Sequence, residues 1–180
     1  DCLDLPEKVY TKRSVSLTSE QVKAYSEMKK AAITFFEENV MTAASVLTQM
    51  IRLHQIICGH VKTDDGEVKS IKSNRIKELL EVLEETDGKV IIWAVYRYDI
   101  QAIEKTLGEK YGKESVATYY GDTKDNLRQS IVDRFMDAND PLRFFIGNPK
   151  TGGYGLTLTS SHTVVYYSND YSLEVRLQSE

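Results

Sequence analysis

The stretch Val90-Ile91-Ile92-Trp93-Ala94-Val95 is a continuous apolar run. A strand with one solvated face alternates polar and apolar residues, whereas an uninterrupted apolar run is typical of a strand buried on both faces of a sheet. Gly88 precedes the run and the polar segment 96–99 follows it. We therefore expect a central, parallel strand here.

Helical and strand patterns alternate on both sides of this run. We expect three helices with apolar residues at helical spacing. The first has Ile76, Leu79, Leu80 and Leu83, is capped by Ser73 or Asn74 and ends near Gly88. The second has Ile100, Ile103 and Leu107, and the third has Leu127, Ile131 and Phe135 and is capped by Thr123. The expected strands are 116–120, 142–146 and 163–167, and a last helix begins at 172–180. Strands separated by helices predict an α/β fold, a parallel sheet with helices on both faces.

The first 72 residues predict a helical appendage. The segment 18–21, Thr-Ser-Glu-Gln, is a capping box for a helix whose apolar face is Val22, Tyr25, Ala32, Ile33 and Phe36. A second helix with apolar residues at 46, 50, 53 and 57 should end at Gly59. The turn signal at 64–66 predicts a small hairpin within 61–71. We thus divide the chain into an appendage, 1–72, and an α/β lobe, 73–180.

Composition excludes several classes of protein. No apolar run among the 180 residues approaches the roughly 18–20 residues of a membrane span. Two cysteines, Cys2 and Cys58, are too few for a disulfide scaffold and fit a reducing cytosol. We find no secretion signal and expect a cytoplasmic location, or the host cytoplasm if the gene is carried by a phage. The chain has no initiator Met, so we expect a piece of a longer protein.

The net charge of the chain limits how it could bind a nucleic acid. The formal net charge is −4, from 23 basic and 27 acidic side chains, and no segment is a basic tail. Non-specific attraction to polyanions is therefore excluded, and a nucleic-acid partner must be held by a few placed groups.

In parallel sheets, function lies in the loops beyond the carboxyl ends of the strands, here 96–99, 121–124, 147–155 and 168–171. The loop 147–155 holds four of the ten glycines. Gly147 and Gly152 have the separation of a P-loop, but Gly153 stands where lysine belongs. A dinucleotide fingerprint fails as well, because Leu158 replaces the third glycine. A phosphate contact and a plain surface loop both stay open.

The loop 121–124 joins a strand to a helix. Free amides at a helix N-terminus can hold a DNA phosphate, with the Thr123 hydroxyl assisting. The alternative is an ordinary capped helix in which Asp122 favours the helix dipole.

Metal and hydrolase sites lack support. Cys58 and His60 offer two possible zinc ligands without a second pair, and His54 and His162 stand apart. No G-x-S-x-G elbow occurs. We expect no metal site.

Several segments together resemble the second RecA-like lobe of Snf-type ATPases in helicase superfamily two. Residues 52–56 are similar to the helix that precedes this lobe, and 89–94 to motif IV. Residues 120–123, with Arg128 and Phe135, are similar to the G-x-[ST]…R…F element. Residues 151–159 are similar to motif V, and 163–172 with Gln178 to the stretch that leads into motif VI. The order and spacing of these motifs carry the resemblance over about 45–180. Departures from the pattern of the family are Thr157 in place of asparagine, Tyr171 in place of tryptophan and Leu173 in place of proline.

The resemblance implies a RecA-like fold and ATP-driven movement along duplex DNA by two lobes that clamp ATP and Mg²⁺ between them. The implied residues at the nucleotide and inter-lobe cleft are Gly152, Gly153, Gly155 and Thr157, and Gln178 opens motif VI. The implied DNA-binding residues are Gly121, Asp122, Thr123, Lys124, Lys150 and Thr151.

The sequence contains no G-x-x-x-x-G-K-[ST] and no D-E-A/G-H box, and it ends before the arginines of motif VI. Those arginines would stabilise charge on the γ-phosphate. We therefore expect the first RecA-like lobe to be the partner that holds ATP, the parent to be an ATP hydrolase, and this chain alone to be inactive. The alternatives are a strand-separating superfamily-two helicase, a restriction-type motor, and a non-catalytic nucleotide- or protein-binding module of the same fold.

Overall fold

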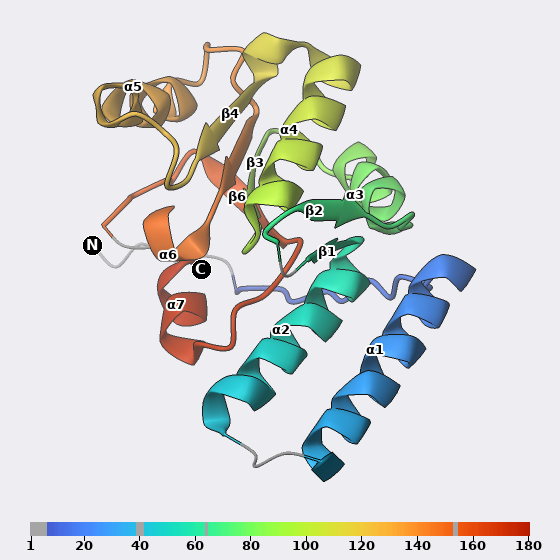
Figure 1. Cartoon of the computed structure of the whole chain (residues 1–180). Coiled ribbons are helices and arrows are strands. Elements are labelled where there is room, and N and C mark those ends of the chain that lie inside the picture. The colour runs from blue at the N-terminus through green and yellow to red at the C-terminus, as the bar shows by residue number, and fades with distance from the viewer. Residues whose placement is uncertain (1–6, 39–41, 64, 153–154) are drawn as a thin grey trace.

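A computed structural model describes residues 7–38, 42–63, 65–152 and 155–180. Its centre is a four-stranded parallel sheet in the order β4-β5-β3-β6 (Figure 1). The strands are β3 (Lys89–Trp93), β4 (Val116–Tyr119), β5 (Phe144–Gly147) and β6 (Ser161–Tyr166). The α/β prediction is confirmed. The apolar run forms the inner strand β3, which pairs with both β5 and β6 and stops before Val95.

Alternate residues of β3 feed two separate core layers. Val90 and Ile92 pack in the layer covered by α3 (Arg75–Glu84) and α4 (Arg97–Tyr111), whereas Ile91 and Trp93 pack in the layer of α5 (Asp125–Met136). Figure 1 shows α3 and α4 on one side of the sheet and α5 on the other. Burying such a side chain stabilises the fold by about 1.5–3 kcal/mol each. The predicted helices on both faces are therefore present.

The appendage is a helical hairpin followed by a small antiparallel sheet. It consists of α1 (Ser19–Glu38), α2 (Ala43–Cys58), β1 (His60–Lys62) and β2 (Val68–Ser70). The capping box at 18–21 is confirmed, since the Gln21 amide donates to Thr18 Oγ1 at 3.2 Å and the Thr18 amide donates to Gln21 Oε1 at 3.1 Å. Gln21 Nε2 also donates to the carbonyls of Ile56 and Ile57, which fastens α1 to the end of α2.

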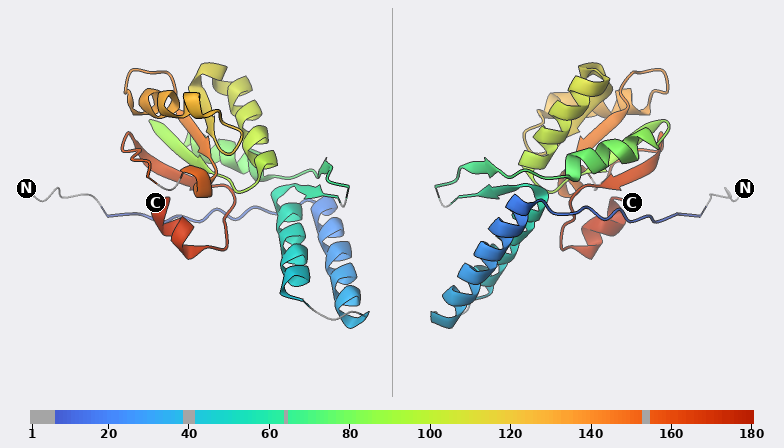
Figure 2. Two further views of the ribbon diagram at one scale, coloured as in Figure 1. Left: turned by 60° about the vertical axis from the view of Figure 1, so that its left-hand side comes forward. Right: turned by 90° about the vertical axis from the view of Figure 1, so that its right-hand side faces the viewer.

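The expected apolar face of α1 is only partly buried. Ala32 is buried, but Val22 and Ile33 are each 50% exposed. The hairpin projects away from the lobe, so α1 packs against α2 and has no sheet to cover (Figure 2). The division at 72/73 stays a prediction.

The expected caps of two helices differ in part from those in the structure. Asn74 is the N-cap residue of α3, but its side chain makes no capping hydrogen bond and donates instead to the Ser16 carbonyl, while the Arg75 amide donates to Ser73 Oγ at 3.3 Å. The prediction that Thr123 caps α5 is wrong, because the N-cap is Lys124 and its side chain makes no capping hydrogen bond.

Two short helices lie near the carboxyl edge of the sheet: α6 (Pro149–Gly152), which follows β5, and α7 (Leu173–Gln178), which follows β6. As predicted, a helix starts after position 172, where Ser172 Oγ accepts from the Val175 amide. A 3₁₀ turn, η1 (Lys113–Ser115), precedes β4. No helix in the described part of the chain is both long and apolar enough to cross a membrane.

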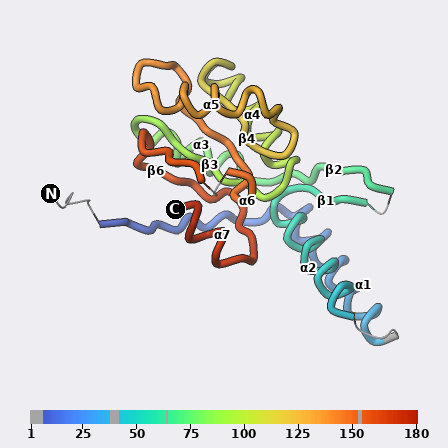
Figure 3. The backbone as a smooth tube through the Cα atoms, turned by 90° about the vertical axis from the view of Figure 1, so that its left-hand side faces the viewer, coloured from blue at the N-terminus to red at the C-terminus, as the bar shows by residue number. Residues whose placement is uncertain are grey.

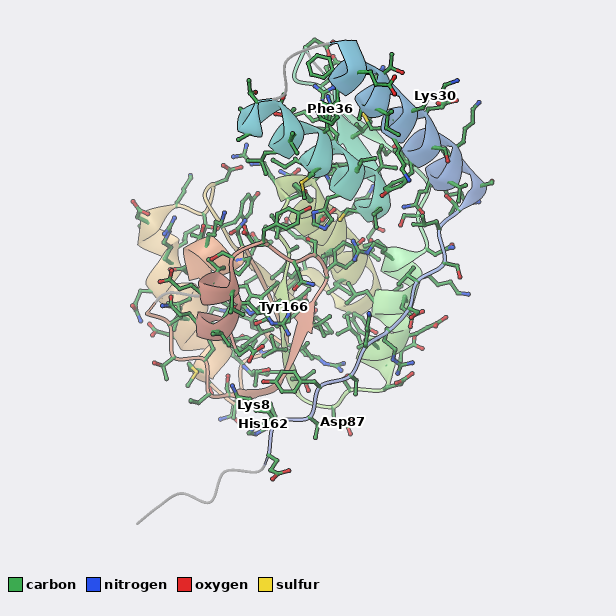
Figure 4. The ribbon with its side chains drawn as sticks, turned by 90° about the horizontal axis from the view of Figure 1, so that it is seen from below. Lys8, Lys30, Phe36, Asp87, His162 and Tyr166 are labelled. Atoms are coloured by element: carbon green, nitrogen blue, oxygen red, sulfur yellow. The ribbon has the colours of Figure 1, made fainter. Side chains whose placement is uncertain are left out.

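The N-terminal segment 7–18 is extended and crosses the lobe past α7 (Figure 3). Near its start, Tyr10 Oη donates to Glu180 Oε2 at 2.9 Å, and Lys8 lies 3.7 Å from the same oxygen. Figure 4 shows this segment from below, with Lys8 at the far end from α1. The two ends of the described chain are therefore held together.

Candidate functional site

An open cleft of about 370 Å³ lies at the carboxyl edge of the sheet. Its lining residues come from the segments that follow β3, β4 and β5, and they are Val95, Arg97, Ile100, Tyr120, Gly121, Asn148, Lys150 and Thr151. Three residues predicted for the DNA surface, Gly121, Lys150 and Thr151, therefore share one cleft. Sequence analysis missed Arg97 and Asn148.

Asn148 makes hydrogen bonds to several of the segments that form this cleft. Its side-chain amide donates to the Val95 carbonyl at 2.9 Å, and its backbone amide donates to the Tyr119 carbonyl at 3.1 Å. Its Oδ1 accepts from the Lys150 amide, and its carbonyl accepts from the amides of Thr151 and Gly152, each at 2.9 Å. Asn148 thus joins the ends of three strands to α6. The Asn-Pro pair at 148–149 is a turn signal that pointed to this position.

The glycines of this loop have different surroundings. A Cβ on Gly147 would lie 2.6 Å from Trp93 Cζ3, and one on Gly152 would lie 3.0 Å from two atoms of the same ring. Gly152 is buried, so it has a packing role that the sequence analysis did not foresee, and its inter-lobe role stays a prediction. Gly155 is exposed with φ +76° and open space around a Cβ. Gly153 lies outside the described residues.

The loop 121–124 is closed by Thr123. Its Oγ1 accepts from the Tyr120 amide and donates to the Thr118 carbonyl, both at 3.0 Å. The hydroxyl is therefore engaged within the loop, and its expected role beside a phosphate stays a prediction. Lys124 and Gly121 are exposed, and a Cβ on Gly121 would meet nothing within 4 Å.

Both basic side chains of the cleft contact a carboxylate. Arg97 Nη2 lies 2.8 Å from Asp122 Oδ1, and Lys150 Nζ lies 2.8 Å from Asp170 Oδ2. Burial alone would raise the pKa of Asp170, but the hydrogen bonds from Lys150 and from the backbone amides of Ser172 and Tyr171 outweigh it and lower that pKa. Two ion pairs therefore connect four loops at this edge of the sheet.

A row of buried polar side chains connects two of these loops and ends beside His60 of the appendage. The Val95 amide donates to Ser168 Oγ at 2.9 Å, which donates to Asp99 Oδ2 at 3.1 Å. Asp99 Oδ1 lies 3.3 Å from His60 Nδ1, and both side chains are almost fully buried. His60 therefore faces a carboxylate of α4.

The expected lack of a metal site stays a prediction. Within the described residues, no three His, Cys, Asp or Glu side chains gather in a way that could hold a metal ion. Burial raises the pKa of the Cys58 thiol to about 12, which keeps this side chain protonated near neutral pH.

The helicase conserved C-terminal domain family matches residues 71–180, more than half of the chain. The chain belongs to this family.

The chain is also similar to several ATP-dependent helicases, at 23–27% identity. The chain is 27% identical over 188 residues to YwqA of Bacillus subtilis, a match that covers 98% of this chain and 20% of that protein. It is 25% identical over 177 residues to the ATP-dependent helicase FUN30 of Saccharomyces cerevisiae, covering 92% of this chain and 14% of FUN30. The chain thus spans well under half the length of the curated relatives that it matches.

The fold is that of a SWI2/SNF2 ATPase C-terminal domain. The C-terminal domain of the Sulfolobus solfataricus SWI2/SNF2 ATPase superposes with a TM-score of 0.71 at 22% identity, covering 86% of this chain and 69% of that one. The core of that ATPase in complex with double-stranded DNA gives a TM-score of 0.72 at 20% identity, covering 86% and 34% of the two chains. The chain therefore has the RecA-like fold that the resemblance implied, and its assignment to the Snf2 type stays a prediction.

In this helicase lobe, α7 contains Gln178, the residue that the resemblance implies to open motif VI. Gln178 is its last residue and is exposed, whereas the next residue, Ser179, is buried and accepts a hydrogen bond from Trp93 Nε1 at its carbonyl, at 3.0 Å. Thr157 is exposed after Gly155. The functional roles of these residues, and of those in the cleft, stay predictions.

Proposed function

We propose that this lobe is the C-terminal half of an ATP-dependent motor that moves along duplex DNA, and that its carboxyl-edge cleft holds backbone phosphates. The observation that supports this most directly is the cleft itself, which Arg97 and Lys150 line together with Gly121 and Thr151. Cationic side chains hold phosphate oxygens.

The chemistry of the cleft favours phosphate over an apolar ligand. Its lining combines two cations with Asn148, Thr151 and an unhindered glycine. The chain as a whole has a net charge of −4, so attraction must come from these placed groups. The DNA-bound state of the Sulfolobus ATPase core, which shares this fold, is consistent with a duplex as the ligand.

The relatives of this chain suggest that the full-length protein uses ATP. The named relatives are ATP-dependent helicases, and we propose that ATP is clamped between this lobe and a first RecA-like lobe, with Gly153, Gly155 and Thr157 facing the junction and Gln178 leading into motif VI. The described residues supply no cluster for Mg²⁺, so we assign the metal to the first lobe and no residue here to it. We propose that the parent acts in the compartment that contains its DNA, the cytoplasm in a prokaryotic or phage-infected cell.

The test is duplex binding by this chain, measured by the anisotropy of a labelled duplex in salt between about 50 and 200 mM. Lys150→Gln should weaken binding several-fold and lower the slope of log affinity against log salt by about 0.9, the value for one lost phosphate contact. The matched control is Lys77→Gln on α3, which removes the same charge from a lysine that pairs with Glu81 at 3.6 Å, away from the cleft. Equal effects of the two substitutions would rule out the cleft as the phosphate site.

A further inference from the structure

The cations of the cleft are already engaged in the free lobe. Arg97 and Lys150 are the two basic residues among those that line it, and each lies 2.8 Å from a carboxylate of a neighbouring loop. A phosphate that enters must therefore compete with a resident carboxylate for each of them.

The two carboxylates differ in how firmly they are held. The Asp170 side chain is 15% exposed and also accepts from the Ser172 amide at 3.0 Å, so it is part of its loop. The Asp122 side chain is 45% exposed, and within the described residues its one hydrogen bond or ion pair is the contact with Arg97. Asp122 can therefore release Arg97 without breaking any other bond.

The Arg97–Asp122 ion pair lies across the end of a central strand. Arg97 begins α4 after β3, and Asp122 lies in the loop after β4. Strand β5 lies between β3 and β4 in the sheet, so the pair spans the end of β5, from which Lys150 follows. The ion pair thus bridges the mouth of the cleft.

We propose that Asp122 is an internal competitor of the DNA phosphate for Arg97. In the free lobe the carboxylate holds the guanidinium across the cleft, and on binding a backbone phosphate takes its place, since a guanidinium can bind two phosphate oxygens at once. Asp122 then sets the affinity and salt dependence of duplex binding. This inference rests on the proposed function of the cleft.

The decisive variant is Asp122→Asn, compared with Asp125→Asn in the same anisotropy titration of a labelled duplex. Both substitutions remove one negative charge, but Asp125 is 96% exposed and pairs with Arg128 on its own helix at 3.2 Å. Asp122→Asn should raise duplex affinity about two- to fivefold, the range for releasing one exposed ion pair. It should also steepen the salt slope, by up to about 0.9 for one phosphate contact. Asp125→Asn should do less on both counts.

Arg97→Gln completes a double-mutant cycle. If the competition is for Arg97, Asp122→Asn should gain no more than Asp125→Asn once Arg97 is replaced. Equal gains from the two asparagine variants, or a gain from Asp122→Asn that survives Arg97→Gln, would overturn the inference.

The two proposals fail in different ways. If Lys150→Gln weakens binding while Asp122→Asn matches Asp125→Asn, the cleft binds phosphate and only the competitor role is wrong. If no duplex is bound at about 50 mM salt, or Lys150→Gln changes nothing, the proposed function of the cleft fails and the competitor role falls with it. Thermal melting of the Arg97, Asp122 and Asp125 variants should match the wild type, because the substituted side chains are at the surface.

Discussion

Substitution of Gly152 by alanine separates a packing role from a ligand role in the glycine-rich loop. The new Cβ would lie 3.0 Å from Cζ3 and Cη2 of Trp93 and 3.4 Å from Tyr119 Cδ1. The indole cannot easily turn away, because it is 2% exposed and its Nε1 donates to the Ser179 carbonyl at 3.0 Å. A Cβ here therefore forces either the ring or α6 to move.

The size of the effect follows from overpacking. Extra atoms in a packed core destabilise by about 1–3 kcal/mol. Alanine is favoured over glycine in a helix by at most about 1 kcal/mol, and Gly152 is the last residue of a four-residue helix, so little is recovered. We expect a net loss of about 1–2 kcal/mol, or a melting temperature lower by roughly 2–8 °C for a chain of this size.

The assay is urea unfolding followed by intrinsic fluorescence, since Trp93 is the one tryptophan of the chain. Gly121→Ala is the matched control, because its Cβ meets nothing within 4 Å and its change in stability should stay within about 0.5 kcal/mol. A Gly152→Ala protein as stable as the wild type, with unchanged emission from Trp93, would refute the packing argument.

Two other predictions address the remaining loops. In the full-length parent, Gly155→Val should abolish DNA-stimulated ATP turnover while the protein stays folded. The reason is that Gly155 has φ +76° in an exposed loop, a conformation in which valine is strained. Full turnover, measured together with thermal melting on one preparation, would contradict this prediction. Asp170→Asn should destabilise the lobe at neutral pH, and since the folded pKa of Asp170 lies below its ordinary value, the difference from wild type should close as the pH falls from about 4 through the folded pKa. Urea unfolding across that pH range checks it, and a gap that persists in acid would show that the ion pair is not its source.

Local signals in the sequence predicted the elements that depend on neighbours along the chain. The apolar run at 90–95 identified the inner strand, and Gly59 ends α2 in the left-handed conformation, as expected. The second capping box, from Thr42 to Ser45, was missed, because serine stands where the usual pattern has glutamate or glutamine. Periodicity predicted one apolar face on α1 but not how little of the molecule lies opposite it, which is why Ile33 is half exposed.

The site was predictable only in outline. Strand ends gave the edge of the sheet, and with it the shared position of Gly121, Lys150 and Thr151. Contacts between distant loops decide the rest: Arg97 meets Asp122, and Gly152 meets Trp93, through tertiary packing that no spacing rule encodes. Thr123 has the residue type of a cap but bonds within its own loop, because the Tyr120 amide and the Thr118 carbonyl are nearer partners.

The hydrogen bonds of Asn148 have a mechanical consequence. Since one residue fastens the ends of β3 and β4 and the start of α6, the floor of the cleft cannot slide relative to the sheet unless several bonds break together. A load applied at Lys150 is therefore passed to three strands at once rather than absorbed by a yielding loop. The base of the cleft should therefore move with the sheet as one rigid unit.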